Sequence, residues 1–308
     1  MELSQLAGNE TLKEQLSQCT REHGLSHAYI LSGPRGSGKH TLARLLAEIC
    51  FCHAPWERRP CLSCAACKKV MGDYHPDLVS VRGEKEKAIS VEQIRNLRAD
   101  AYIRPNEAPR KIYILEQAQR MKGEAQNALL KLLEEGPEYA MFLLLEDEGG
   151  GLLPTIHSRC ELFFLTPVGE EEALRYLRRR FPQEEEKRLR EAAQACQGIL
   201  GRGVEQLLLP PEEFARETEQ ARALAKAMEE GEELELFLRA RVLDGLKGEA
   251  LKRLLDRCTE ELGSRLSQSR DPERICRGLE LLRELRAAAE LNVSGGQQWG
   301  WLCAGMYT

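Results

Sequence analysis

The chain has 308 residues, of which 42% are hydrophobic and 30% are charged, a balance that supports packed cores and excludes wholesale disorder. Lys plus Arg number 44 and Asp plus Glu number 49, so the formal net charge is -5 and any contact with nucleic acid needs a local basic patch or a partner chain. No apolar run approaches the ~20 residues that cross a bilayer and the first residues lack a signal-peptide pattern, so we expect a cytoplasmic protein without membrane contact.

The first half of the chain alternates between predicted helices and predicted strands. A helical pattern covers residues 12–19, another helix is expected at about 41–50, and Ser90, a helix-capping residue, begins the next one. A further helix is predicted at 124–134. Short apolar stretches predict strands at 27–31, 77–81, 111–115, 140–145 and 161–165. Such an alternation is typical of a parallel sheet covered on both faces, so we predict an α/β domain.

Strand signals end near Pro167, and the remaining chain is predicted to be helical. The amphipathic stretches are 170–180, 184–196, 198–209, 214–230, 233–242, 248–266 and 272–291. Pro210-Pro211 is the clearest linker among them. Residues 295–308, which include Trp299 and Trp301, do not continue the helical pattern. The acidic run 146–148, followed by three glycines, predicts a mobile turn.

These boundaries predict three domains. Residues 1–166 form the α/β domain, with a four-cysteine module inserted at about 50–70. Residues 167–209 form a small helical domain, and residues 210–308 form a C-terminal helical bundle.

A phosphate-binding pattern follows the first predicted strand and opens the next helix. It reads Gly33-Pro34-Arg35-Gly36-Ser37-Gly38-Lys39. In this context a G-x-x-x-x-G-K loop directs backbone N–H groups at phosphates and its lysine reaches the outer ones. The candidate nucleotide-binding residues are Gly33, Gly36, Gly38, Lys39 and Thr41, and the sequence leaves open whether they hold ATP, ADP or another anion.

The residues that would support hydrolysis are altered. His40 replaces the hydroxyl residue that normally binds magnesium, with Thr41 one residue later. Imidazole is a poor ligand for this hard cation, so we expect no Mg²⁺. The strand end expected to carry Asp-Glu reads Glu116-Gln117, and an amide cannot take a proton from water. We therefore expect no intrinsic ATP hydrolysis; the alternative is a divergent ATPase in which Thr41 and Glu116 hold magnesium.

Four of the eleven cysteines are spaced as metal ligands. Cys52, Cys61, Cys64 and Cys67 follow the pattern C-x8-C-x2-C-x2-C, and Cys50 and His53 are nearby substitutes for the first ligand. Four thiolates suit tetrahedral Zn²⁺ and leave no open position, so we predict a structural zinc site. An iron–sulfur cluster and scattered reduced cysteines are the alternatives, whereas a disulfide framework is not expected without a secretion signal.

Several motifs, taken in order, resemble one family. They are His27-Ala28-Tyr29, the four-cysteine insert, His75-Pro76-Asp77, the stretch 127–137 (NALLKLLEEGP) and Ser158-Arg159-Cys160. Together they resemble the bacterial clamp loaders, the AAA+ subunits of the DNA polymerase III holoenzyme. The resemblance covers about residues 4–165, and beyond it residues 198–203, with Arg202, resemble the family's second-sensor segment.

The resemblance implies an AAA+ P-loop domain, a helical lid and a C-terminal helical collar. The losses at His40 and Gln117, with Glu146-Asp147 near the first-sensor position, resemble the delta-prime branch rather than the ATP-hydrolysing tau/gamma branch. This branch implies a non-hydrolysing stator whose Arg159, beside Ser158, is directed at the ATP of a neighbouring subunit. The implied partners are the delta and tau/gamma subunits and, through the complex, the sliding clamp and primer-template DNA. A gamma-like ATPase, or a zinc-containing nucleotide-binding adaptor outside replication, are the alternatives.

Overall fold

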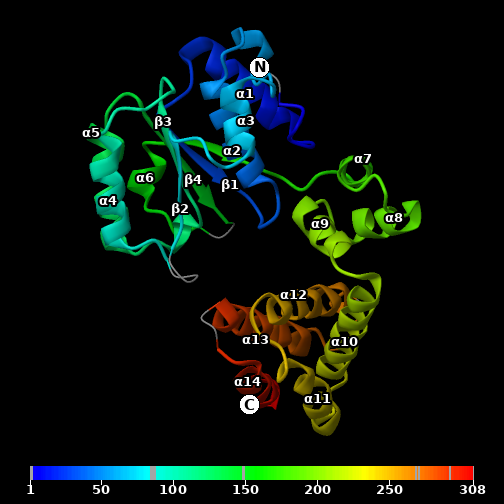
Figure 1. Ribbon diagram of the computed structural model, residues 1–308. Coiled ribbons are helices and arrows are strands. Elements are labelled where there is room, and N and C mark those ends of the chain that lie inside the picture. Colours follow the sequence, from blue (N-terminus) through cyan, green and yellow to red (C-terminus); the bar gives the residue numbers. More distant parts are fainter. Residues whose placement is uncertain are drawn as a thin grey trace. The chain divides into compact units, whose positions relative to one another are not determined.

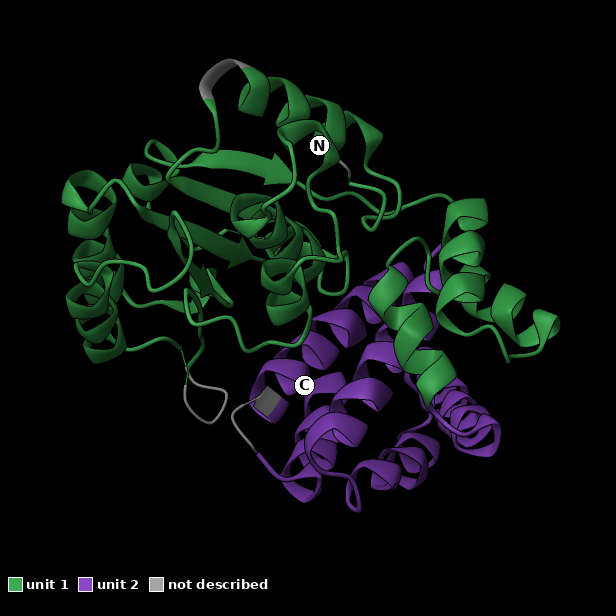
Figure 2. Cartoon of the chain, turned by 45° about the horizontal axis from the view of Figure 1, so that its top comes forward, with its two compact units in different colours: residues 1–208 green, residues 209–308 purple. Residues whose placement is uncertain are grey.

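The computed structural model describes residues 3–83, 88–147, 150–267, 269, 271–290 and 293–307. The chain divides into two compact units, Met1–Leu208 and Leu209–Thr308 (Figure 2). Each unit has its own hydrophobic core and is described by itself. No described helix combines the length and the apolar content that crossing a lipid bilayer requires.

The centre of the first unit is a five-stranded parallel sheet with strand order β2-β3-β4-β1-β5. The strands are β1 (Ala28–Ser32), β2 (Leu78–Val81), β3 (Lys111–Leu115), β4 (Ala140–Glu146) and β5 (Glu161–Phe164). All five had been expected from their apolar runs, and β1, β3 and β4 are buried along their whole length. The predicted parallel α/β fold is confirmed.

Helices cover both faces of this sheet (Figure 1). Alternate strand residues point to opposite faces. Tyr29 and Leu31 of β1 pack with α1 (Glu10–His23), α2 (Lys39–Phe51) and α3 (Ala65–Met71). Ala28 and Ile30 pack with α4 (Val91–Ala101), α5 (Gly123–Glu135) and α6 (Pro154–His157). Short 3-10 turns, Trp56–Arg58 and Ala118–Arg120, lie in the connections.

Local hydrogen bonds fix two of these connections. Ser90 begins α4 as predicted, because its Oγ accepts the N–H of Gln93 at 3.2 Å and its own N–H donates to the Gln93 side chain at 3.0 Å. The loop before β3 is held by Asp77, which is fully buried. Its carboxylate accepts the backbone N–H groups of Asn106, Glu107 and Ala108 at 2.6, 2.8 and 2.9 Å.

Three short helices complete the first unit. They are α7 (Glu170–Arg180), α8 (Glu186–Ala195) and α9 (Leu200–Leu208), and they share a small core around Leu177 and Leu189. The chain enters them after β5, where Val168 donates a backbone hydrogen bond to Gly198 at 3.0 Å. This bond joins the entry segment to the start of α9.

The second unit is a helical bundle around one core. Its elements are α10 (Pro211–Glu230), α11 (Glu233–Ala240), a 3-10 turn (Arg241–Leu243), α12 (Gly248–Arg265), α13 (Pro272–Glu290) and α14 (Gly295–Tyr307). Buried Glu217 of α10 binds Arg253 and Arg257 of α12. The Pro210-Pro211 pair, predicted as a linker, begins α10: Pro211 is its first helical residue, a position that needs no backbone N–H.

The prediction for the C-terminal residues was wrong, because they form the helix α14. Glycines hide its amphipathic pattern and permit very close packing. A Cβ at Gly295 would lie 1.7 Å from the Leu243 carbonyl oxygen, and one at Gly305 would lie 2.4 Å from a Leu281 methyl group. The mobile turn predicted at 146–148 falls partly outside the described residues, and Glu146 is the last residue of β4.

Candidate functional site

The predicted phosphate loop connects β1 to α2 at the carboxyl edge of the sheet. Gly33, Gly36 and Gly38 all have positive φ values, at 152°, 87° and 104°. A side chain at Gly33 would collide with the Leu165 carbonyl oxygen, 2.6 Å from an added Cβ. The sequence therefore forms a compact glycine loop whose shape other residues could not adopt without strain.

The loop is in contact with the segment predicted as a second sensor. Gly201 of α9 donates its N–H to the Gly36 carbonyl at 2.9 Å. The backbones approach so closely that a Cβ on Gly201 would lie 2.6 Å from the Gly36 Cα. The structure thus brings residues 198–203 to the phosphate loop, with Arg202 on the exposed side of α9.

The side chain of Lys39 turns back into its own loop. Its ammonium donates to the carbonyl oxygens of Gly33 and Pro34, the latter at 2.9 Å. It also forms an ion pair with the Asp147 carboxylate at 2.8 Å, and only 7% of the lysine side chain is exposed. Three oxygen atoms therefore surround the charge that a phosphate would otherwise bind.

Two further polar atoms beside the loop lack partners among the described residues. Ser37 Oγ and Glu146 Oε1 are buried and accept or donate no hydrogen bond there. Glu146 pairs in register with Ser32 across β4 and β1, which places its carboxylate at the strand edge that carries the loop. The loop thus has two neighbouring acids, Glu146 and Asp147.

The predicted magnesium and base positions are present but do not converge on Lys39. His40 and Thr41 are exposed in the first turn of α2. Glu116 uses its backbone N–H to bond Val81 after β3 has ended. Gln117 is exposed with a left-handed backbone, and its side-chain oxygen accepts from Arg120 at 2.9 Å.

The predicted arginine finger lies after α6, on the surface of the first unit. Arg159 donates to the Thr155 carbonyl at 2.8 Å and to Ser158 Oγ at 3.3 Å. It also forms an ion pair with Glu134 of α5. About one third (35%) of the arginine side chain is exposed, so the guanidinium is held at the surface and is not part of a core.

The four predicted metal ligands lie together. The sulfur atoms of Cys52, Cys61, Cys64 and Cys67 are all within 4.8 Å of one another. Thiolates that bind one zinc at about 2.3 Å are roughly 3.8 Å apart, so the described geometry fits a four-coordinate ion. The substitutes do not join them: Cys50 is buried elsewhere and His53 is exposed.

Hydrogen bonds around the cluster favour thiolates. Cys52 Sγ accepts the N–H groups of Ala54 and Cys61 at 3.4 and 3.3 Å. The hydrogen bonds from Ser63, and then from the Cys64 N–H, lower the pKa of Cys61 to about 5. A lowered thiol pKa is the property that metal ligation requires, since the thiolate is the binding form.

Sequence analysis did not identify the partners that hold the two cationic residues. Asp147 was noted only for its position near the first sensor, and Glu134 only as part of a motif. The pairing of Asp147 with Lys39 depends on β4 lying beside β1, which the chain order does not reveal.

The sequence family described as "DNA polymerase III, delta subunit" matches residues 8–169, just over half of the chain. The chain is 37% identical over 167 residues to DNA polymerase III subunit delta' of Pseudomonas aeruginosa, covering 54% of this chain and 51% of that protein. It is 35% identical over 159 residues to subunit tau of Bacillus subtilis, covering 51% of this chain and 28% of that protein. It is 38% identical over 144 residues to subunit delta' of Bacillus subtilis, covering 47% and 43%. The chain thus spans about half or less of the length of these relatives.

A solved structure shares the fold along nearly the whole chain. It is a DNA polymerase III gamma subunit-related protein from Thermotoga maritima, with a TM-score of 0.52 and 21% sequence identity. The similarity covers 94% of this chain and 97% of that one. At this identity it supports the architecture alone.

Proposed function

The chain belongs to the DNA polymerase III delta-subunit family and is a clamp-loader protein related to the tau and gamma subunits, and we propose that it acts there as a delta-prime-like subunit that does not hydrolyse ATP. In this proposal it is a stator of the clamp loader. It works through a neighbouring ATPase subunit while the complex places the sliding clamp on primed DNA.

The pairing of Lys39 is the observation that carries this proposal. In hydrolysing P-loop proteins this lysine binds the β- and γ-phosphates. Here its ammonium is buried against two loop carbonyls and the Asp147 carboxylate. His40 and Gln117 add to the case, because neither side chain can supply the magnesium or base chemistry that hydrolysis needs.

Arg159 is the residue we propose to act on the neighbouring subunit. A surface guanidinium can reach phosphates on another chain, where an arginine finger is worth roughly 10³–10⁵ in rate. Its contacts with Ser158 and the Thr155 carbonyl orient the side chain without enclosing it. This function requires no nucleotide in the loop of Gly33, Gly36, Gly38, Lys39 and Thr41.

The proposed partners follow from the family. Residues 167–209 would be the lid, and residues 210–308 the collar through which the chain joins the delta and tau/gamma subunits. The sliding clamp and primer-template DNA would be contacted through the complex. As a replication subunit the chain would act in the cytoplasm.

The cysteine cluster is proposed to hold a structural zinc ion. Cys52, Cys61, Cys64 and Cys67 would be its ligands, and zinc would supply a cross-link with no catalytic position. The ligands come from the end of α2, the following loop and α3, so the ion would fix α3 to the sheet-covering helix α2.

The ATPase activity of the chain, alone and in a reconstituted clamp loader, tests the proposal. We expect no turnover from the isolated chain, and a loss of at least about tenfold in DNA- and clamp-stimulated hydrolysis when the complex carries Arg159→Ala. Arg95→Ala, an exposed arginine of α4, is the matched control and should leave the rate unchanged. Turnover by the isolated chain that disappears in Lys39→Ala would instead identify a gamma-like ATPase.

A further inference from the structure

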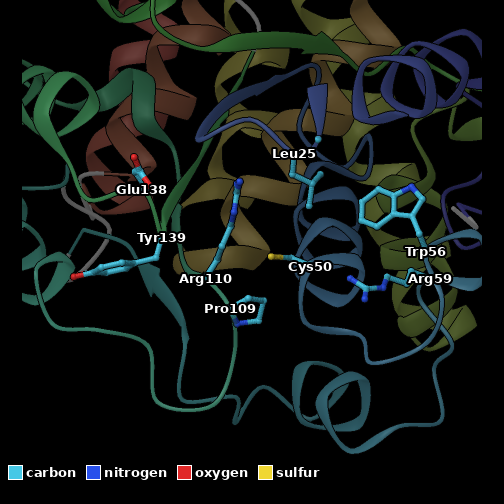
Figure 3. Close-up of a pocket in the computed structure, with 9 residues that line it drawn as sticks. Leu25, Cys50, Trp56, Arg59, Pro109, Arg110, Glu138 and Tyr139 are labelled. Carbon is cyan, nitrogen blue, oxygen red and sulfur yellow. The ribbon is translucent and has the colours of Figure 1, made fainter. Parts of the chain in front are cut away.

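A second pocket opens at the edge of the sheet opposite the phosphate loop (Figure 3). Its lining residues come from the segments that lead into β1, β3 and β4, from the last turn of α2 and from the cysteine module. The cavity has a volume of about 470 Å³, within the range of small-molecule sites. Because the strands are parallel, their starts and ends lie at opposite edges, and this pocket is separate from Lys39.

Two arginines enter the pocket from different segments and are held by backbone oxygens. Arg59 Nε donates to the Ala54 carbonyl at 2.8 Å, and Arg110 Nη1 donates to the Ser26 carbonyl at 3.0 Å. These bonds fix the guanidinium groups but leave their other N–H donors without a described acceptor. No described carboxylate lies within ion-pair distance of either guanidinium.

Apolar and aromatic atoms form the rest of the site. The Trp56 ring lies 5.5 Å from the Arg59 guanidinium and is partly buried against the core of the first unit. The Cys50 thiol lies between the two arginines in Figure 3 and is 6% exposed. Burial raises the pKa of Cys50 to about 11, and the positive charges of Arg110 and Arg59 oppose that rise. Both charges therefore act on the same small region.

We propose that this pocket binds a small organic anion. A carboxylate or phosphate group would pair with the free donors of Arg59 and Arg110, and an apolar body would cover Trp56 and Cys50. Planar guanidinium forks suit both anions, and two like charges held together favour a ligand that neutralises them. Glu138 is the one acidic lining residue and is exposed, so the pocket keeps a net positive charge.

Trp56 fluorescence provides the test, with phenyl phosphate and benzoate as the two probes and neutral benzyl alcohol as the control. We expect saturable binding of at least one anionic probe, and the stronger probe identifies the preferred anionic group. Arg59→Gln and Arg110→Gln should each weaken it by about tenfold or more, as expected for lost charge-assisted hydrogen bonds. Trp56→Phe should remove the signal, which assigns it to this tryptophan rather than to Trp299 or Trp301.

Two matched variants separate this pocket from other sites. Arg95→Gln removes an exposed arginine elsewhere, and Lys39→Ala alters the phosphate loop; neither should change the affinity. Arg59→Lys keeps the charge and serves if Arg59→Gln disturbs the cysteine module. The proposal is wrong if neither anion binds saturably, if benzyl alcohol binds equally well, if the arginine variants bind normally, or if Lys39→Ala abolishes binding.

Discussion

The ammonium of Lys39 lies 2.8 Å from the carboxylate of Asp147, which joins the start of α2 to the chain that leaves β4. The two residues meet because β4 is hydrogen-bonded to β1 along its length, so that both strands end at the same edge. An acid supplied by the chain itself therefore occupies the lysine. This relationship leads to the first prediction.

Asp147→Asn is expected to raise the affinity of the isolated chain for ADP. The substitution removes a negative charge beside the loop while it keeps the side-chain shape, and we expect a gain of several-fold or more. Fluorescent-ADP titration measures it. Adding Lys39→Ala to the variant should cancel the gain, and tight ADP binding by the unsubstituted chain would contradict the interpretation.

Glu134→Gln is expected to leave the clamp-loader ATPase at or above its normal rate. Glu134 pairs with Arg159 on the surface of its own chain, and in the proposed mechanism this pairing competes with the phosphates of a neighbour. Surface ion pairs contribute about 0–1 kcal/mol, so stability should change little. Steady-state hydrolysis and thermal unfolding check both points. A loss of rate comparable to Arg159→Ala would mean that Glu134 positions the finger.

Removal of the metal is expected to destabilise the first unit. Cys64→Ser should eliminate bound zinc and lower the Tm of that unit by roughly 5–10 °C, and a chelator should have the same effect on the unsubstituted chain. Elemental analysis and calorimetry measure these quantities. Cys50→Ser is the matched control, since this buried thiol lies outside the cluster, and it should retain one zinc per chain.

Asp77 is expected to make the stability of the first unit depend on pH. Burial alone would raise the pKa of Asp77, but the hydrogen bonds from the N–H groups of Asn106, Glu107 and Ala108 outweigh it and lower the pKa. A lowered folded-state pKa stabilises the fold above the unfolded value of about 3.9, and this contribution is lost as the pH falls through the folded-state pKa.

Asp77→Asn should therefore cost about 1–3 kcal/mol near neutral pH and flatten the decline in acid. Urea unfolding followed by Trp56 fluorescence at neutral and acidic pH gives both values. Asp73→Asn, whose exposed carboxylate pairs only at the surface, should behave like the unsubstituted chain. Equal stability of Asp77→Asn at neutral pH would show that the 104–109 loop does not depend on this carboxylate.

The sheet and most helices could be predicted because their signals are local. The strands are continuous apolar runs, and Ser90 with Gln93 is a self-contained capping pattern. The short helices α3 and α6 were not predicted, since seven and four residues carry little periodicity. Helix α14 was missed because its packing depends on absent side chains at Gly295 and Gly305, which only the tertiary structure reveals.

The candidate site divides in the same way. Spacing alone brought the four cysteines together, because their ligand pattern lies within sixteen residues of chain from Cys52 to Cys67. The partners of Lys39 and Arg159 come from other strands and helices. Such pairings depend on strand order and on the packing of α5 beside α6, and sequence spacing does not encode either of them.

The hydrogen bond between Gly201 and Gly36 fastens the lid to the phosphate loop at a point where neither residue has a side chain. With the Val168–Gly198 bond, it gives the lid two backbone attachments, one at its entry and one at its far end. A body attached at two points cannot swing about either of them alone. The first unit is therefore braced like a fixed bearing, against which the moving members of an assembly can turn.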